Sequence, residues 1–324
     1  MASVFILTLF RAEIALSLGL LLTLGLRAPA RRLIGPLLGY RLWMLGPAAA
    51  LTSVFPSLAE FIVPGAPLGR GQLHGALMTG LRAVTDNAFW AAPADVLIGV
   101  WLTGVACLAI IFLTAELRFR RLARLGLAGP AVVGVAWPRL VVPSDFAERF
   151  SAQERDFIRR HERAHMQRQD TLANLMMAVV QALSWFNPLV HLAAAQARLD
   201  QELACDAQVV DGRPADRRLY GEALLKVQLS RRARGLACSW APVGRHPLEL
   251  RLLLLKAAEP SLVRHVAGAV AVVTLGVALS VGVWSLAPSN GPVRIAETPM
   301  ISLSIRLAAP SHAAGARPSA QTQS

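Results

Sequence analysis

The sequence predicts a mostly helical, polytopic membrane protein with four spans and one α+β domain between the third span and the fourth. Two observations support this fold class. The 324 residues are 54% hydrophobic and only 16% charged, with a mean hydropathy of +0.47, which is too apolar for an ordinary water-soluble globule. The apolar residues also gather into four stretches of roughly 20 residues, the length that a helix needs to cross a bilayer.

The four predicted spans are not equally apolar. They cover Val4–Leu26, Leu42–Val63, Val96–Ala115 and Val266–Ala287. The last two hold no charged residue, whereas the first contains Arg11 and Glu13 and the second contains Glu60. Charges within a span usually face the interior of a helix bundle. The first stretch lacks a basic start, so a span is favoured there over a cleaved signal peptide.

The arginine distribution predicts how the spans are oriented. Arginines follow the first and third spans and precede the fourth, whereas the loop before the third span holds only Arg70 and Arg82. Cytoplasmic loops carry the excess of basic residues, so we expect the N-terminus outside and the middle segment inside. The predicted parts are three spans with short loops (1–117), a cytoplasmic domain (118–264), the fourth span (265–287) and a flexible extracytoplasmic tail (288–324).

Local patterns predict the elements of segment 118–264. They are a strand pair over 131–142 and helices over 145–180, 189–210 and 220–229. β-Branched residues flank Trp137-Pro138, which favours the strand pair. Ser151 and Glu154 have the spacing of a capping box, and Asn187-Pro188 interrupts the helical pattern.

One motif on the first of these helices indicates metal chemistry. His161, Glu162 and His165 form H-E-x-x-H. Residues four apart share a helical face, so both imidazoles can bind one zinc ion while Glu162 lies beside it as a general base. Zinc lowers the pKa of a bound water toward about 7, which generates a nucleophile at neutral pH. The alternative is a surface helix with incidental histidines.

A catalytic zinc needs a third protein ligand and an open position. Glu202 and Asp206 are four residues apart in the following helix, after the break that lets the chain return toward His165. Glu202 is the predicted third ligand, and Asp206 is either a fourth ligand or a group that orients a ligand. Asp200 lies on another face and is expected in solvent, while Cys205 is expected to be a small buried residue.

The segment from Gly129 to about Leu229 resembles the BlaR/MecR family of antirepressor metallopeptidases. The matching pieces are GVAWPRLVVP, HERAHMQRQD, LSWFNPLVHL, QELACDAQVV and YGEALLKVQL. Together they are much more specific than H-E-x-x-H alone. The arrangement of two spans, a loop, a third span, the zinc domain and a fourth span matches as well. The resemblance implies a multi-pass protein of the bacterial inner (cytoplasmic) membrane.

The resemblance also implies a gluzincin-like Zn²⁺ site. Its implied residues are the metal ligands His161, His165 and Glu202, the catalytic base Glu162, and the neighbouring acidic residues Asp206 and Asp170. The run Trp185–Pro188 is expected to be structural. His191 and His246 have no partner at ligand spacing and are expected to be packed or solvated. Tyr220 and His246 are weak candidates for stabilising an oxyanion.

The chain departs from the best-known members of that family in its sensor. Residues 288–324 are too few for a penicillin-binding domain, and Ala223 and Leu253 stand three residues before the two lysines, so S-x-x-K does not occur. Direct covalent β-lactam sensing is therefore not expected. The signal would come from a separate sensor protein or from the membrane.

The sequence thus favours a membrane zinc endopeptidase of signal transduction, with regulation of antibiotic resistance as the implied context. Its expected partners are a cytoplasmic BlaI/MecI-like repressor as substrate, the lipid bilayer and a second copy of the chain, with no direct nucleic acid. The protein could also cleave itself. Two alternatives stay open: a general quality-control zinc peptidase, and a non-catalytic transducer that retains the zinc fold.

Overall fold

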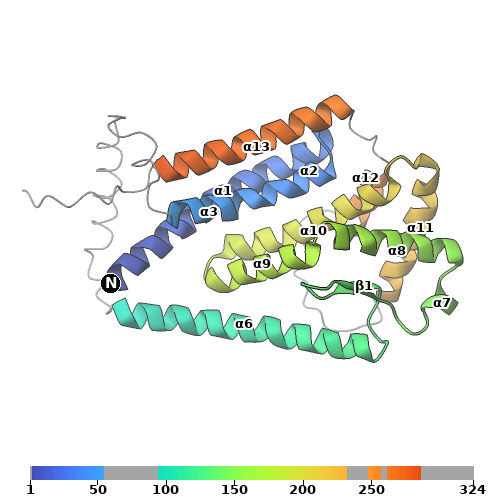
Figure 1. Cartoon of the computed structure of the whole chain (residues 1–324), viewed down its shortest axis with the longest axis horizontal. Helices are drawn as coiled ribbons and strands as arrows, with labels where there is room; N and C mark the ends of the chain where they lie inside the picture. Colours follow the sequence, from blue (N-terminus) through green and yellow to red (C-terminus); the bar gives the residue numbers. More distant parts are fainter. Residues whose placement is uncertain (1, 55–93, 232–246, 257–260, 286–324) are drawn as a thin grey trace, which may run out of the picture. The chain divides into compact units, whose positions relative to one another are not determined.

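The protein is described by a computed structural model that covers residues 2–54, 94–231, 247–256 and 261–285. It is mostly helical, as predicted, and Figure 1 shows the arrangement of the helices. The helices of the N-terminal part are α1 (Ala2–Leu33), α2 (Pro36–Arg41), α3 (Leu45–Val54) and α6 (Ala94–Arg124), with a 3-10 turn η1 (Leu42–Met44). The last described helix is α13 (Leu262–Ser285). The elements between them are β1 (Ala131–Val133), β2 (Arg139–Val141), α7 (Phe146–Arg149), α8 (Ala152–Gln167), α9 (Asp170–Leu183), α10 (Pro188–Val210), η3 (Pro214–Asp216), α11 (Arg217–Arg231) and α12 (Pro247–Leu255).

Three helices in the described part of the chain are long and apolar enough to cross a membrane. They cover Thr8–Leu33, Asp95–Arg124 and Leu262–Val283, in the regions of the first, third and fourth predicted spans. Of the second predicted span, η1 and α3 account for the residues up to Val54. Residues 55–63 lie outside the described residues, as does the tail 288–324, so the second span and the flexible tail stay predictions.

The first span packs closely on α3. A side chain added at Gly19 would place its Cβ 2.7 Å from the Cα of Gly46, so both glycines allow the two backbones to approach, as small residues do between membrane helices. Both charged residues of α1's apolar part face protein. Arg11 donates to the carbonyl of Ser53 at 3.0 Å, and the carboxylate of Glu13 accepts a hydrogen bond from the side-chain amide of Asn187.

The segment between α6 and α13 contains the predicted strand pair. β1 and β2 pair antiparallel, with Ala131 opposite Val141. The capping box is also confirmed, since Ser151 and Glu154 exchange side-chain and backbone hydrogen bonds at the start of α8.

The prediction of one continuous helix over 145–180 is wrong, because the segment forms α7, α8 and α9. Phe150 is extended, which ends α7 so that Ser151 can cap α8. Gln169 then adopts the left-handed region with φ 55, and the chain turns there before α9.

The prediction that Asp200 lies in solvent is also wrong. Asp200 on α10 is fully buried and accepts hydrogen bonds from Trp43 at 2.8 Å, Arg31 at 2.8 Å and Arg27 at 3.4 Å. Helical phase alone does not show what covers this face of α10. In the structure, that face is covered by the C-terminal part of α1 and the helical turns after it. A carboxylate buried in this way is stable only when it is paired.

We expect Asp200→Asn to destabilise the protein by about 3 kcal/mol, because it leaves the largely buried guanidinium groups of Arg27 and Arg31 without a carboxylate. The measurement is the free energy of unfolding in detergent. Glu222→Gln is the matched control, since it removes an exposed ion pair with Arg218 and should change stability by less than about 0.5 kcal/mol. Equal stability of the two variants would contradict the structural role of Asp200.

Candidate metal centre

Helix α8 brings the two histidines of the motif together on one face. The Nε2 atoms of His161 and His165 lie 3.2 Å apart, with the rings at 83° to each other. Glu162, the residue between them in the motif, is buried and lines the same cavity of about 190 Å³. The structure therefore brings the three side chains of the motif to one cavity.

Helix α10 adds a carboxylate to this pair. Glu202 places Oε2 at 3.4 Å from Nε2 of His161 and Oε1 at 3.6 Å from Nε2 of His165. Tetrahedral zinc with bonds of about 2.0–2.1 Å holds its ligand atoms roughly 3.3–3.4 Å apart. The two imidazoles and this carboxylate therefore fit a divalent zinc ion in both spacing and donor type.

The opposite nitrogen of each imidazole is held by a second group. Nδ1 of His165 lies 2.7 Å from Oδ2 of the buried Asp170. Nδ1 of His161 lies 2.9 Å from the hydroxyl of Tyr220. Such contacts fix the orientation of a histidine and the nitrogen it presents. Both imidazoles therefore present Nε2 toward Glu202.

Asp206 lies on the Nδ1 side of His161, away from Glu202. Its Oδ1 accepts from Tyr220 at 2.6 Å and is 3.5 Å from Nδ1 of His161. Both carboxylate oxygens also accept from Arg251, at 2.7 and 2.8 Å. Of the two alternatives left by the sequence, this position favours a residue that supports His161 over a fourth ligand.

Arg251 is the residue at this site that the sequence reasoning missed. Its guanidinium joins Asp206 to Glu202, whose Oε2 lies 3.0 Å from Nη1. The signal in the sequence was a lone arginine among the leucines of PLELRLLLL. Arginine is almost never fully buried unless it is paired, and this one is 4% exposed.

Cys205 also gathers with the two histidines but approaches a different face. Its Sγ lies 3.2 Å from Nδ1 of His165 and accepts from Arg168 at 2.8 Å. Glu202 faces Nε2 of the same ring. An ion bound to Glu202 and to Nε2 of His165 would therefore lie on the other side of the ring from Cys205. Burial raises the pKa of this thiol well above its usual range, and Cys205 is a small buried residue, as predicted.

The electrostatics keep Glu202 ionised. Burial opposes its ionisation, but the hydrogen bond with His161 and the charge of Arg251 outweigh burial and hold the pKa of Glu202 well below its usual range. Burial and Asp206 raise the pKa of Tyr220, so its hydroxyl stays protonated. The lowered pKa favours the carboxylate form of Glu202, which is the form that binds a metal.

The remaining histidine and aromatic predictions have mixed outcomes. His191 is packed as expected, with Nδ1 on Gln181 and Nε2 on the carbonyl of Trp185. Asn187 caps α10 as the structural reading required. The hydroxyl of Tyr220 is already bonded to two groups, which weakens its candidacy for an oxyanion. His246 lies outside the described residues.

Comparisons with known proteins match the part of the chain that contains these residues. Residues 122–255 match the family described as BlaR1 peptidase M56. The regulatory protein BlaR1 of Bacillus licheniformis is 33% identical over 118 residues, which cover 34% of this chain and 19% of that protein. The methicillin resistance mecR1 protein of Staphylococcus aureus is 28% identical over 101 residues, which cover 31% and 17%.

The apolar helices are consistent with a membrane protein, and the matched segment resembles a metallopeptidase family. Parts of the chain are similar to the BlaR1 and MecR1 regulatory proteins. The matched region spans less than a fifth of the length of these relatives.

We expect Asp170→Asn to lower zinc affinity by about 10–100-fold, because it replaces the carboxylate that holds Nδ1 of His165. Competition with a chelator measures the affinity. Asp216→Asn, on the surface at η3, is the control and should leave zinc affinity unchanged. Unchanged affinity in Asp170→Asn would show that the contact does not support metal binding.

We expect Arg251→Gln to destabilise the metal-free protein by about 3 kcal/mol, because the buried carboxylate of Asp206 and the partly buried carboxylate of Glu202 lose their cation. Bound zinc would neutralise Glu202 directly, so the loss should be smaller with zinc than without it. Melting temperatures with zinc and with chelator measure both cases. Lys256→Gln, an exposed residue directly after the same helix, is the control. An equal loss with and without zinc would contradict the link between Arg251 and Glu202.

Proposed function

We propose that the protein is a membrane zinc endopeptidase with a gluzincin-like centre. In this proposal His161, His165 and Glu202 bind the zinc ion and Glu162 is the general base. The observation that supports it most directly is the convergence of two imidazole nitrogens and one carboxylate at 3.2–3.6 Å, with a further carboxylate buried beside them.

The proposed chemistry divides between the metal and the protein. Zinc, when bound, supplies Lewis acidity that activates a water and polarises the scissile carbonyl. Glu162 accepts the proton of the attacking water and passes it to the leaving nitrogen. Asp170 and Asp206, the latter through Tyr220, hold the two imidazoles, while Arg251 holds Glu202. Asp206 thus acts in this proposal as a support for His161.

The cavity suggests how a peptide would bind. Ala131 and Val132 of β1 line it together with the histidines and Glu162. An extended peptide that added to β1 as a further strand would place one of its carbonyls near the centre. Leu224 and Val227 of α11 line the same cavity, which would suit an apolar side chain of that peptide.

The proposed substrate is a cytoplasmic repressor of the BlaI/MecI type, or the chain itself, and the role is signal transduction. This proposal rests on the relationship to the BlaR1 and MecR1 regulatory proteins. In this proposal, three spans lie within residues 1–117, the cytoplasmic catalytic domain covers 118–264, the fourth span covers 265–287 and an extracytoplasmic tail covers 288–324. The protein lies in the bacterial inner membrane. A separate sensor protein and a homodimer belong to the same proposal.

We expect Glu162→Gln to retain zinc and to lose cleavage of a co-expressed BlaI/MecI-type repressor by about 100-fold or more, because the general base is removed. The assay follows the repressor fragments after purification of the full chain in detergent, and zinc content is measured in parallel. Glu222→Gln, at an exposed side chain of α11, is the control.

The outcomes separate the alternatives. Undiminished cleavage in Glu162→Gln would refute the assignment of the base. Cleavage of unfolded membrane proteins without any effect on the repressor would favour a quality-control peptidase. Stoichiometric zinc with no turnover in the native chain would favour a non-catalytic transducer.

A further inference from the structure

Helix α9 and the first half of α10 form a hairpin whose outer face is apolar from Leu175 to Ala195, with the exposed Asn174 and Arg198 on either side of this stretch. Between residues 175 and 195, all of which the structure describes, every exposed side chain is apolar. These residues are Leu175, Met176, Val179, Leu183, Phe186, Pro188, Leu192 and Ala195. Met176 is 56% exposed and Phe186 and Leu192 are each 48% exposed. A helix of a water-soluble domain carries polar residues on its outer face.

Three polar side chains of the hairpin, those of Gln181, His191 and Arg198, bond to one another or to the backbone. Gln181 is buried; its amide nitrogen donates to Nδ1 of His191 at 3.1 Å, and its amide oxygen accepts from Arg198 at 3.3 Å. Nε2 of His191 donates to the carbonyl of Trp185. Polar groups satisfied within a bundle and apolar groups outside it are the pattern of protein inside a bilayer.

The tip of the hairpin is attached to the helix of the third predicted span. Trp101 donates to the carbonyl of Leu183 at 2.8 Å, and Trp185 donates back to the carbonyl of Trp101 at 3.2 Å. The ring of Trp185 lies against Gly104, where an added Cβ would come within 2.1 Å of it. These residues of α6 lie far along the helix from its arginine-rich end at Arg124.

The other side of the hairpin runs along α1 in a matching register. At the tip, Asn187 donates to Glu13 at 3.0 Å and to Ser17 at 2.9 Å. At the base, Asp200 accepts from Arg27 and Arg31. The 13 residues from 187 to 200 correspond to about 20 Å of helix, against a hydrocarbon thickness of about 30 Å.

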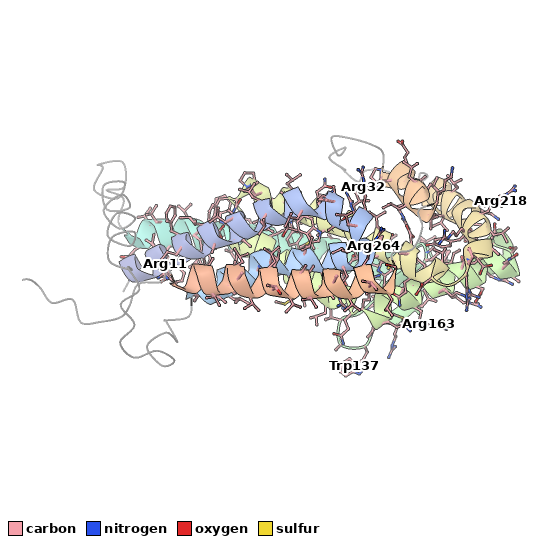
Figure 2. The ribbon with its side chains drawn as sticks, turned by 90° about the horizontal axis from the view of Figure 1, so that it is seen from above. Arg11, Arg32, Trp137, Arg163, Arg218 and Arg264 are labelled. Atoms are coloured by element: carbon pink, nitrogen blue, oxygen red, sulfur yellow. The ribbon has the colours of Figure 1, made fainter. Side chains whose placement is uncertain are left out.

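The arginine-rich ends of the helices mark where the hairpin begins. Figure 2 shows Arg32 and Arg264, at the ends of α1 and α13, displaced toward the end that carries Arg163 and Arg218, and Arg11 toward the other end. The base of the hairpin, at Asp200, contacts this arginine-rich end of α1. Its tip, at Asn187, contacts Glu13 and Ser17 in the apolar part of the same helix.

We propose that the α9–α10 hairpin is inserted in the bilayer beside the spans, with its outer face in contact with lipid acyl chains. The attachment of its tip to α1 and α6 argues for lipid as the occupant, because it fixes the apolar face at the depth of two spanning helices. Asp170 begins α9 at the base of the hairpin, so the metal centre lies at the membrane surface. Peptide bonds close to that surface are then the ones within reach.

Spin labels on the full chain in liposomes test this placement. Met176→Cys and Phe186→Cys carry the nitroxide on the hairpin, Ile110→Cys on α6 is the lipid-facing reference, and Arg218→Cys is the water-facing reference. Cys107 and Cys238 are replaced by alanine, and the buried Cys205 is kept; the unmodified background sets the blank. Collision rates with oxygen, which partitions into lipid, and with a water-soluble nickel chelate are compared.

We expect both hairpin labels to match Ile110, with oxygen collisions several-fold above nickel collisions, and Arg218 to show the reverse order. Nickel collisions at 176 and 186 equal to those at 218 would overturn the proposal by placing the face in water. Low rates with both reagents would also overturn it, because a second copy or residues 55–93 would then cover the face. Val179→Cys and Leu192→Cys replace any variant that fails to resist proteolysis. Repeating the measurement in Glu162→Gln separates this placement from the proposed peptidase activity.

Discussion

The buried carboxylate of Asp200 is the interaction on which the arrangement of helices depends. It holds α10 to α1 through Arg27 and Arg31, and two residues later the same helix delivers Glu202 to the histidines of α8. Because α10 is one rigid helix over this short distance, the contact of Asp200 with α1 also fixes where Glu202 lies. Helix α10 therefore links the predicted first span to the candidate metal centre. We expect loss of the ion pair to weaken the packing of α10 on α1 and to displace Glu202 at the same time.

The candidate centre has a supporting layer of charges behind it. Asp206, Tyr220 and Arg251 form a connected set in which Arg251 contacts both Asp206 and Glu202. Burial makes each of these groups costly alone and stable together. Arg251 lies on α12, which directly precedes the segment leading to α13, so the fourth predicted span is connected through few residues to the carboxylate that would bind zinc.

Local periodicity carries the part of the candidate site that lies within one helix. Helical spacing puts His161 and His165 on one face of α8, because periodicity within a helix is local information, and the structure brings Glu202 of α10 near both rings. The same reasoning failed for Asp200, since what covers a helical face depends on other helices. The single helix expected over 145–180 failed because the capping box at Ser151 and the turn at Gln169 end one helix and begin another.

By itself the sequence determined that the protein is apolar enough for membrane helices and that two imidazoles and a carboxylate can meet at one ion. Only the tertiary structure decided which buried charges are paired and where the hairpin of α9 and α10 lies. Asp206 pairs with an arginine 45 residues away and Asp200 with one 173 residues away. Local periodicity does not reveal such partners, because they come from distant helices. A buried charge is stable only when packing brings an opposite charge to it.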